Sequence, residues 1–168
     1  MRFLAGVLFG ILLVGLGAVA FLATGSFNVA ATLPPGNVEK QIAAFALNKS
    51  VQKRAPNTKN PLAGNADALR GGLAHYKEMC VTCHGAPGVD PSEIGEGLNP
   101  PAPDLTLSKV QGRTDGQLFW LVQNGIRMTG MPAFGPTHKD EEIWKIVTFL
   151  RHLPELTPEE EKQLKPAE

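Results

Sequence analysis

Residues 80–84 read Cys-Val-Thr-Cys-His and place two thiols and an imidazole close together in the chain. These two cysteines are the only ones among 168 residues. Two cysteines are too few for the several disulfide bridges that replace a core in small secreted folds. On a helix, thiols three residues apart lie on one face. The fold therefore has to present Cys80, Cys83 and His84 together, which constrains it more than any other feature.

The spacing Cys-x-x-Cys-His is typical of the attachment site of a c-type haem. The two thiols add to the haem vinyl groups, and the imidazole becomes an axial iron ligand. The sequence therefore predicts one covalently bound haem c on Cys80 and Cys83, with His84 as an iron ligand. A thioredoxin-like pair would need an adjacent βαβ pattern, and a structural zinc site would need a fourth ligand. A simple disulfide would leave His84 without a role.

A long stretch rich in glycine and proline, residues 85–112, follows the motif. A structureless loop of this length is unusual inside a domain of about 100 residues. We therefore expect a group other than protein to organise this stretch, and the predicted haem is such a group.

A second axial ligand is expected from one of five side chains, namely His75, Met128, Met131, His138 and His152. Met131 is favoured because it stands in an irregular loop, where Gly130 permits close backbone approach and Pro132 stiffens the chain. Met128, three residues earlier, is the main rival. His75 and His152 fall on predicted helices, where a packing or solvated role is expected.

Three helical patterns and almost no strand signal predict an all-α domain. The first pattern places four residues on one helical face, Leu69, Leu73, Tyr76 and Cys80. A second helix is predicted over Thr114–Asn124, with a Thr-x-x-Gln capping box at its start and Gly125 after its end. A third is predicted over residues 139–153. The haem domain is expected to span residues 61–158, followed by a charged tail at 159–168.

The N-terminal segment contains no charged residue between Arg2 and Glu39, and residues 3–23 form an unbroken apolar run. At about 1.5 Å per helical residue, this run spans about 30 Å, the thickness of the bilayer's hydrocarbon core. Residues 1–24 are therefore predicted to be a transmembrane anchor. A signal peptide cleaved near residues 29–31 is the alternative. The positive-inside rule places the N-terminus in the cytoplasm and the rest of the chain outside.

The zero net charge of the chain is the sum of Arg2 and two segments of opposite charge. Residues 36–60 carry five basic residues and one acidic residue, whereas residues 61–168 carry ten basic and fifteen acidic residues, a net of −5. Residues 25–60 are predicted to be a basic linker with a candidate amphipathic helix from about Val38 to Arg54. That helix could lie on anionic headgroups, dock on a partner or serve as a solvated spacer. The neutral overall charge gives no reason to expect a nucleic-acid-binding protein.

Residues 61–153 resemble the class I c-type cytochromes, which carry one haem ligated by His and Met. In that family a glycine and an aromatic residue, eight and four residues before the first cysteine, join the first helix to the last. Gly72 and Tyr76 hold those positions here, opposite three residues of the last helix, Ile146, Phe149 and Leu150. The segment 130–132 is similar to the family's distal ligand loop, which implies that Met131 is the second iron ligand.

The resemblance extends to residues 100–105, which are similar to a haem-lining loop of bacterial members. In that loop a proline carbonyl accepts a hydrogen bond from the axial histidine. Pro100, Pro101 and Pro103 all stay candidates for this role. Trp120 and Arg127 are candidate partners of the haem propionates, although surface or core roles are equally compatible with the sequence.

The resemblance implies an electron carrier rather than an enzyme, because two protein ligands leave no iron position for a substrate. It implies a single-pass protein of the bacterial cytoplasmic membrane with the haem domain on the periplasmic side. The implied partners are membrane lipid, a quinol:cytochrome c oxidoreductase-type donor, and a terminal oxidase or reaction-centre-type acceptor in respiratory or photosynthetic electron transport. Two alternatives stay open: an integral subunit of a larger oxidoreductase complex, and a haem enzyme or gas sensor in which Met131 dissociates.

Overall fold

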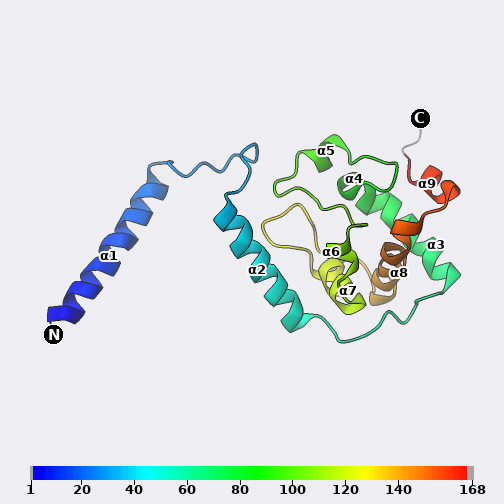
Figure 1. Ribbon diagram of the computed structural model, residues 1–168, viewed down its shortest axis with the longest axis horizontal. Coiled ribbons are helices and arrows are strands. Elements are labelled where there is room, and N and C mark those ends of the chain that lie inside the picture. The colour runs from blue at the N-terminus through cyan, green and yellow to red at the C-terminus, as the bar shows by residue number, and fades with distance from the viewer. Residues whose placement is uncertain (1, 166–168) are drawn as a thin grey trace. The chain divides into compact units, whose positions relative to one another are not determined.

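The computed structural model describes residues 2–165, and its regular structure is entirely helical over that range. The all-α prediction is therefore confirmed for these residues. The chain forms two compact units, one ending at Leu33 and the other beginning at Pro34. The elements (Figure 1) are α1 (Arg2–Ala23), α2 (Asn37–Arg54), α3 (Ala66–His75), the π-helical turn η1 (Tyr76–Cys80), α4 (Val81–His84), α5 (Glu93–Glu96), α6 (Ser108–Gln111), α7 (Asp115–Asn124), α8 (Asp140–His152), the 3-10 turn η2 (Leu153–Glu155) and α9 (Pro158–Leu164).

The first unit contains α1 and the turns that follow it. α1 is 22 residues long, has a mean hydropathy of 2.5 over its most apolar window and buries none of its side chains. By length and composition it is a candidate membrane span, the one such helix among the described residues. Its position matches the predicted apolar run at residues 3–23.

The second unit is built on the crossing of α3 and α8. At Gly72 the helices approach so closely that a Cβ would overlap the Lys145 carbonyl and lie 2.8 Å from Phe149 Cβ. The buried Tyr76 ring, directly after α3, packs on the Phe149 ring with centroids 5.1 Å apart. These contacts confirm the prediction that Gly72 and Tyr76 join α3 to the last long helix, α8.

The core of the second unit gathers around α8. α8 buries a continuous face, Ile143, Ile146, Val147, Phe149 and Leu150. α7 packs beside it through Leu118, Phe119 and Val122, and the Phe119 ring stacks on Trp144 at 4.3 Å between centroids. The predicted capping box is present, because Thr114 and Gln117 bond reciprocally at the start of α7, and Gly125 ends the helix with φ 63°.

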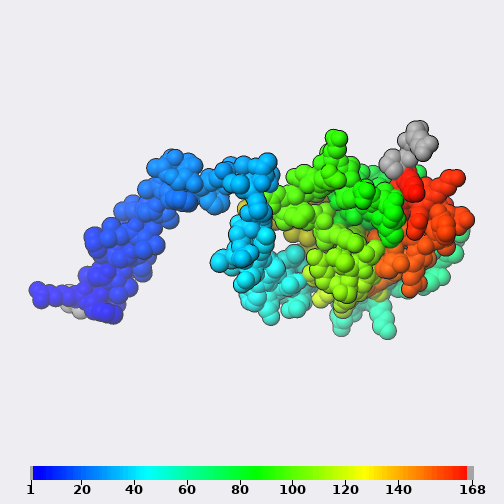
Figure 2. All heavy atoms as spheres, turned by 45° about the horizontal axis from the view of Figure 1, so that its top comes forward, coloured from blue at the N-terminus to red at the C-terminus, as the bar shows by residue number. Residues whose placement is uncertain are grey.

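Two flanking helices also pack on this core. In α2, Val51 is fully buried, and the Asn48 side chain accepts a hydrogen bond from Arg113 at 2.9 Å. Figure 2 shows the C-terminal part of α2 against the rest of the unit. α9 buries Leu164, and its Glu160 lies 2.9 Å from His152 Nε2. Part of the predicted linker and part of the predicted tail therefore pack on the core, since Val51 and Leu164 are buried in it.

Replacing Gly72 with alanine is expected to destabilise the second unit by about 2 to 3 kcal/mol, because the Lys145 backbone cannot move away without separating α3 from α8. Gly71→Ala is the matched control, since a Cβ there meets the flexible Lys145 side chain, 3.2 Å away. Guanidinium unfolding of the full chain in mild detergent, followed by circular dichroism, measures the difference. Equal free energies of unfolding for the two variants would contradict a tight crossing.

Candidate functional site

The residues of the Cys-x-x-Cys-His motif are positioned by the helical segment that continues α3. The turn η1 ends at Cys80, and α4 carries Cys83 and His84. The Tyr76 hydroxyl donates a hydrogen bond to the Gly85 carbonyl at 2.6 Å, which ties the start of this segment to its end. Burial raises the pKa of Tyr76 far above its ordinary value, so the hydroxyl stays protonated and remains a donor. The motif is thereby fixed relative to the α3–α8 crossing.

The two thiols are half-buried, and neither forms a disulfide in the structure. Burial, and secondarily the nearby Cys83, raise the pKa of the Cys80 thiol to about 12. Redox-active Cys-x-x-Cys pairs depend on a thiol whose pKa is lowered, because the thiolate is the reactive species. The environment of Cys80 does the opposite and argues against a thioredoxin-like pair.

His84 is held in one tautomer by the loop that faces it. Its Nδ1 lies 2.8 Å from the Pro103 carbonyl oxygen. Because a carbonyl can only accept, Nδ1 carries the proton and Nε2 keeps a free lone pair. Burial lowers the pKa of His84, although the bond to Pro103 acts in the opposite direction. A neutral imidazole with an available Nε2 is the form that binds metals. Of the three candidate prolines, Pro103 is therefore the one whose carbonyl meets His84.

The first half of the 85–112 stretch packs directly on the motif. The backbone N–H and the hydroxyl of Ser92 both donate to the Thr82 carbonyl at 2.9 Å. A Cβ at Gly95 in α5 would lie 2.9 Å from Cys83 Cα, so the two backbones are in contact there. Ala86 and Val89 exchange backbone hydrogen bonds at 2.8 and 2.9 Å.

The second half of this stretch is fixed through Gln111. Its side-chain amide donates to the Leu105 carbonyl at 2.7 Å and to the Leu150 carbonyl of α8 at 2.9 Å. Leu105 lies two residues after Pro103, so α8 helps to place the carbonyl that meets His84. The expectation that a group other than protein organises residues 85–112 stays a prediction, and such a group would not act alone. Side-chain amides and backbone contacts supply part of that order.

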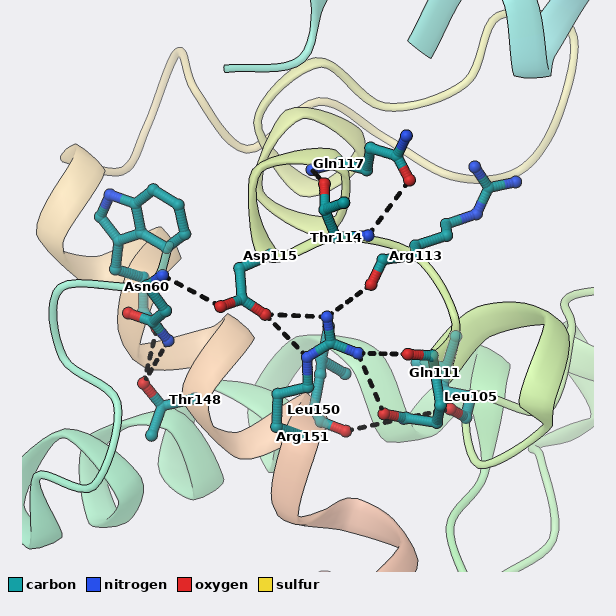
Figure 3. A network of polar contacts seen from close by, with 11 residues as sticks. Asn60, Leu105, Gln111, Arg113, Thr114, Asp115, Gln117, Thr148, Leu150 and Arg151 are labelled. Carbon is teal, nitrogen blue, oxygen red and sulfur yellow. Dashed lines mark hydrogen bonds and ion pairs between the residues drawn. The ribbon is translucent and has the colours of Figure 1, made fainter. Parts of the chain in front are cut away.

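Arg151 of α8 is the centre of the polar network that holds Gln111 (Figure 3). Its guanidinium donates to the carbonyl oxygens of Gln111 at 2.6 Å and Arg113 at 2.5 Å, and its Nε donates to Asp115 at 2.8 Å. The other carboxylate oxygen of Asp115 accepts the Asn60 backbone N–H at 3.0 Å. Residues 60, 111, 113 and 115 are thus gathered around one cation. No periodic pattern in the sequence predicts these contacts.

The charge of Asp115 is stabilised within this network. Partial burial by itself would raise the pKa of Asp115, but the Asn60 N–H and the Arg151 guanidinium outweigh burial and lower it below its ordinary value of 3.8. The carboxylate therefore stays ionised and paired at neutral pH.

The two candidate methionine ligands lie in different surroundings. Met131 is half-buried and packs against the hydrophobic core. Its backbone carbonyl accepts the Ile126 N–H at 3.2 Å, and its N–H donates to the Thr129 hydroxyl, also at 3.2 Å. Met128 is 90% exposed and has a positive φ of 60°. The Met128 side chain thus lies in solvent, whereas Met131 packs on the core.

The other candidate residues have partners elsewhere. The rings of His75 and His138 meet edge to face at 5.5 Å, and His152 contacts Glu160. Trp120 is half-buried on α7, and Arg127 is exposed in the loop after it.

An open hollow of about 410 Å³ lies beside His84. Its walls come from residues 86–91 and 102–106, the two halves of the loop described above. Met131 does not line this hollow. The structure therefore brings His84 and the loop together around one cavity and places Met131 on the core side.

Two comparisons with known proteins bear on this site. A family model described as cytochrome c oxidase, cbb3-type, subunit III matches residues 67–150, which include the Cys-x-x-Cys-His motif and Met131. The quinohemoprotein alcohol dehydrogenase ADH IIB of Pseudomonas putida is 28% identical over 156 residues, which cover 88% of this chain. The chain spans about a fifth of the length of that relative, 21%.

The stability that Asp115 provides is expected to depend on pH. Asp115→Asn should lower the free energy of unfolding by about 1 to 2 kcal/mol at neutral pH, since it removes a charge-assisted bond to Arg151. The pKa of Asp115 is lower in the folded than in the unfolded chain, so this contribution is complete above the ordinary value of 3.8 and is lost as pH falls below it. Unfolding of the parent and the variant between pH 7 and pH 3 measures the effect. A difference that grows on acidification would refute this assignment.

Proposed function

Because the chain belongs to the cytochrome c family described as cbb3-type cytochrome c oxidase subunit III, a family that implies bound haem c, we propose that it is a membrane-tethered monohaem cytochrome. Cys80 and Cys83 hold one haem through thioethers, and His84 and Met131 bind its iron. The protein carries one electron at a time between redox partners.

The donor set around His84 carries this proposal. Two thiols that form no disulfide lie in the same motif as an imidazole whose Nδ1–H is engaged by Pro103, so Nε2 alone is available for a metal. Such a carbonyl contact fixes the ring and increases the basicity of the ligating nitrogen. Met131 is half-buried and packs on the hydrophobic core, and this apolar setting for its thioether supports its role as the second ligand.

The residues of the chain prepare this site for electron transfer. A bound haem c supplies a centre that accepts and releases one electron reversibly. Pro103 holds His84 in a single orientation. In the distal loop, a Cβ at Gly125 would lie 2.6 Å from the Pro132 carbonyl carbon, so this close backbone packing fixes the segment that carries Met131. Both ligands are positioned by contacts that do not depend on the oxidation state, which keeps structural rearrangement small.

The tether and the charge of the haem domain suggest how the protein meets its partners. With α1 in the membrane and the N-terminus in the cytoplasm, the haem domain faces the periplasm of a bacterial cell. Tethering raises the local concentration of the domain near membrane complexes. The net charge of −5 over residues 61–168 would steer it towards a basic partner surface. A quinol-oxidising complex as donor and a terminal oxidase or reaction centre as acceptor fit this role.

A second candidate role is that of a fixed subunit. The matching family is described by the name of an oxidase subunit. The Pseudomonas putida relative is named as a haem-containing dehydrogenase of which this chain spans about a fifth, 21%. A domain of this kind therefore occurs within larger oxidoreductases. In such an assembly the electron would pass across a permanent interface.

Met131→Ala is expected to abolish the weak Met-to-Fe(III) charge-transfer absorption of the oxidised protein and to lower its reduction potential, because a thioether ligand favours the reduced state. Met128→Ala is the matched control and should leave both unchanged, since Met128 is 90% exposed. Visible spectra and a redox titration of both variants make the comparison. Loss of the absorption in Met128→Ala alone would reverse the assignment.

The rate of reduction by the physiological donor in native membranes is expected to fall as ionic strength rises. Salt screens the attraction between the acidic haem domain and a basic partner. Stopped-flow spectroscopy over a range of salt concentrations measures this dependence. A rate independent of salt would favour the fixed-subunit role over the mobile carrier.

A further inference from the structure

α2 carries apolar side chains on two opposite faces, and only one face is covered. Val51 is fully buried against the second unit. On another face, Val38, Ile42 and Phe45 recur at helical spacing and are 71%, 64% and 66% exposed. We call these three residues the α2 stripe. Contiguous exposed apolar side chains of this kind usually mark a contact with a membrane or another molecule.

The direction in which the stripe faces is fixed by the attachment of α2 to the rest of the second unit. After α2, the Pro56 carbonyl packs so tightly on Gly116 of α7 that a Cβ would overlap it. Four residues later the Asn60 side chain donates to the buried Thr148 hydroxyl at 2.8 Å. The helix is therefore a rigid extension of the haem domain rather than a freely moving spacer.

The charge of α2 favours an anionic surface as the occupant. Four basic residues, Lys40, Lys49, Lys53 and Arg54, stand against the single acidic residue Glu39 on this helix. Lys49 extends along the stripe, with its Nζ 5.8 Å from the centre of the Phe45 ring. By their spacing, Lys49 and Lys53 lie on the side of the stripe, whereas Lys40 and Arg54 lie on the opposite side of the helix. An apolar stripe with two lysines beside it matches a phospholipid surface, where apolar side chains enter the acyl boundary and ammonium groups meet phosphates.

The length of chain before α2 limits how far the helix can lie from the membrane. α1 ends at Ala23 and α2 begins at Asn37, so 13 residues separate them. Fully extended, those residues reach about 45 Å. With α1 in the bilayer, the bilayer surface lies within reach of α2.

We propose that the α2 stripe lies in the surface of an anionic phospholipid bilayer and orients the haem domain relative to it. This inference rests on the proposed membrane anchoring by α1. Contact with the bilayer removes three large apolar side chains from water and brings Lys49 and Lys53 close to lipid phosphates.

The test is photocrosslinking of the full haem-loaded chain. Benzoylphenylalanine is introduced at Ile42, at Phe45 or, as the matched control, at the exposed Ala43 on a different side of α2. The chain is irradiated in native membranes and in vesicles of phosphatidylglycerol and phosphatidylcholine. We expect phospholipid adducts in intact mass spectra, several-fold more abundant from positions 42 and 45 than from 43, and reduced in vesicles of phosphatidylcholine alone.

A double substitution provides an independent check. With the probe at Val38, Ile42→Glu combined with Phe45→Glu should abolish the lipid adduct, whereas Ala43→Glu should preserve it. Crosslinks to protein instead of lipid, equal adducts at position 43, or no adduct at any position would overturn the proposal. Extraction of the full chain from membranes by carbonate would instead count against anchoring by α1, while the adduct pattern separately decides the position of α2.

Discussion

The contact between Gly72 and the Lys145 carbonyl fixes both sides of the candidate haem site at once. From this crossing, α3 continues into η1, which ends at Cys80, and then into α4, which carries Cys83 and His84. On the other side, α8 continues to Arg151, whose guanidinium holds the second half of the long loop. That loop returns the Pro103 carbonyl to His84. A closed ring of contacts therefore starts and ends at the motif. A small shift of α3 or α8 would change the position of the His84 imidazole.

The ion pair between Arg151 and Asp115 illustrates how the fold tolerates partly buried charge. Both side chains are about a quarter to a third exposed, at 31% and 24%. An arginine in such a place is costly unless its donors find acceptors. Here the donors of Arg151 meet the Asp115 carboxylate and two backbone carbonyls. The ion pair therefore orders a loop that has few backbone hydrogen bonds of its own. The network thus stabilises the loop through satisfied polar groups rather than through apolar burial.

Much of the fold could be predicted from local patterns, because capping boxes, helical periodicity and the position of Gly72 can each be recognised within a short segment. The capping box at Thr114 and the Gly72 contact are confirmed. Three features of the structure could not be predicted from the sequence. The choice of Pro103 and the bond from Gln111 to Leu150, 39 residues away, depend on tertiary register. The burial of Leu164 could not be foreseen, since one apolar residue in a charged segment has no period.

The fastening of Asn60 also has a mechanical consequence. If α1, the candidate membrane span, were held in a bilayer and pulled or twisted, force would enter the second unit through α2 and the chain that follows it. In that chain, Asn60 forms hydrogen bonds to Asp115 and Thr148, and the Pro56 backbone packs on Gly116. These three contacts would carry the force together. The load is therefore taken up by the amino end of α7 and by α8 before it reaches the start of α3. Because α8 also crosses α3 at Gly72, part of such a load would reach the segment that carries the motif through this crossing.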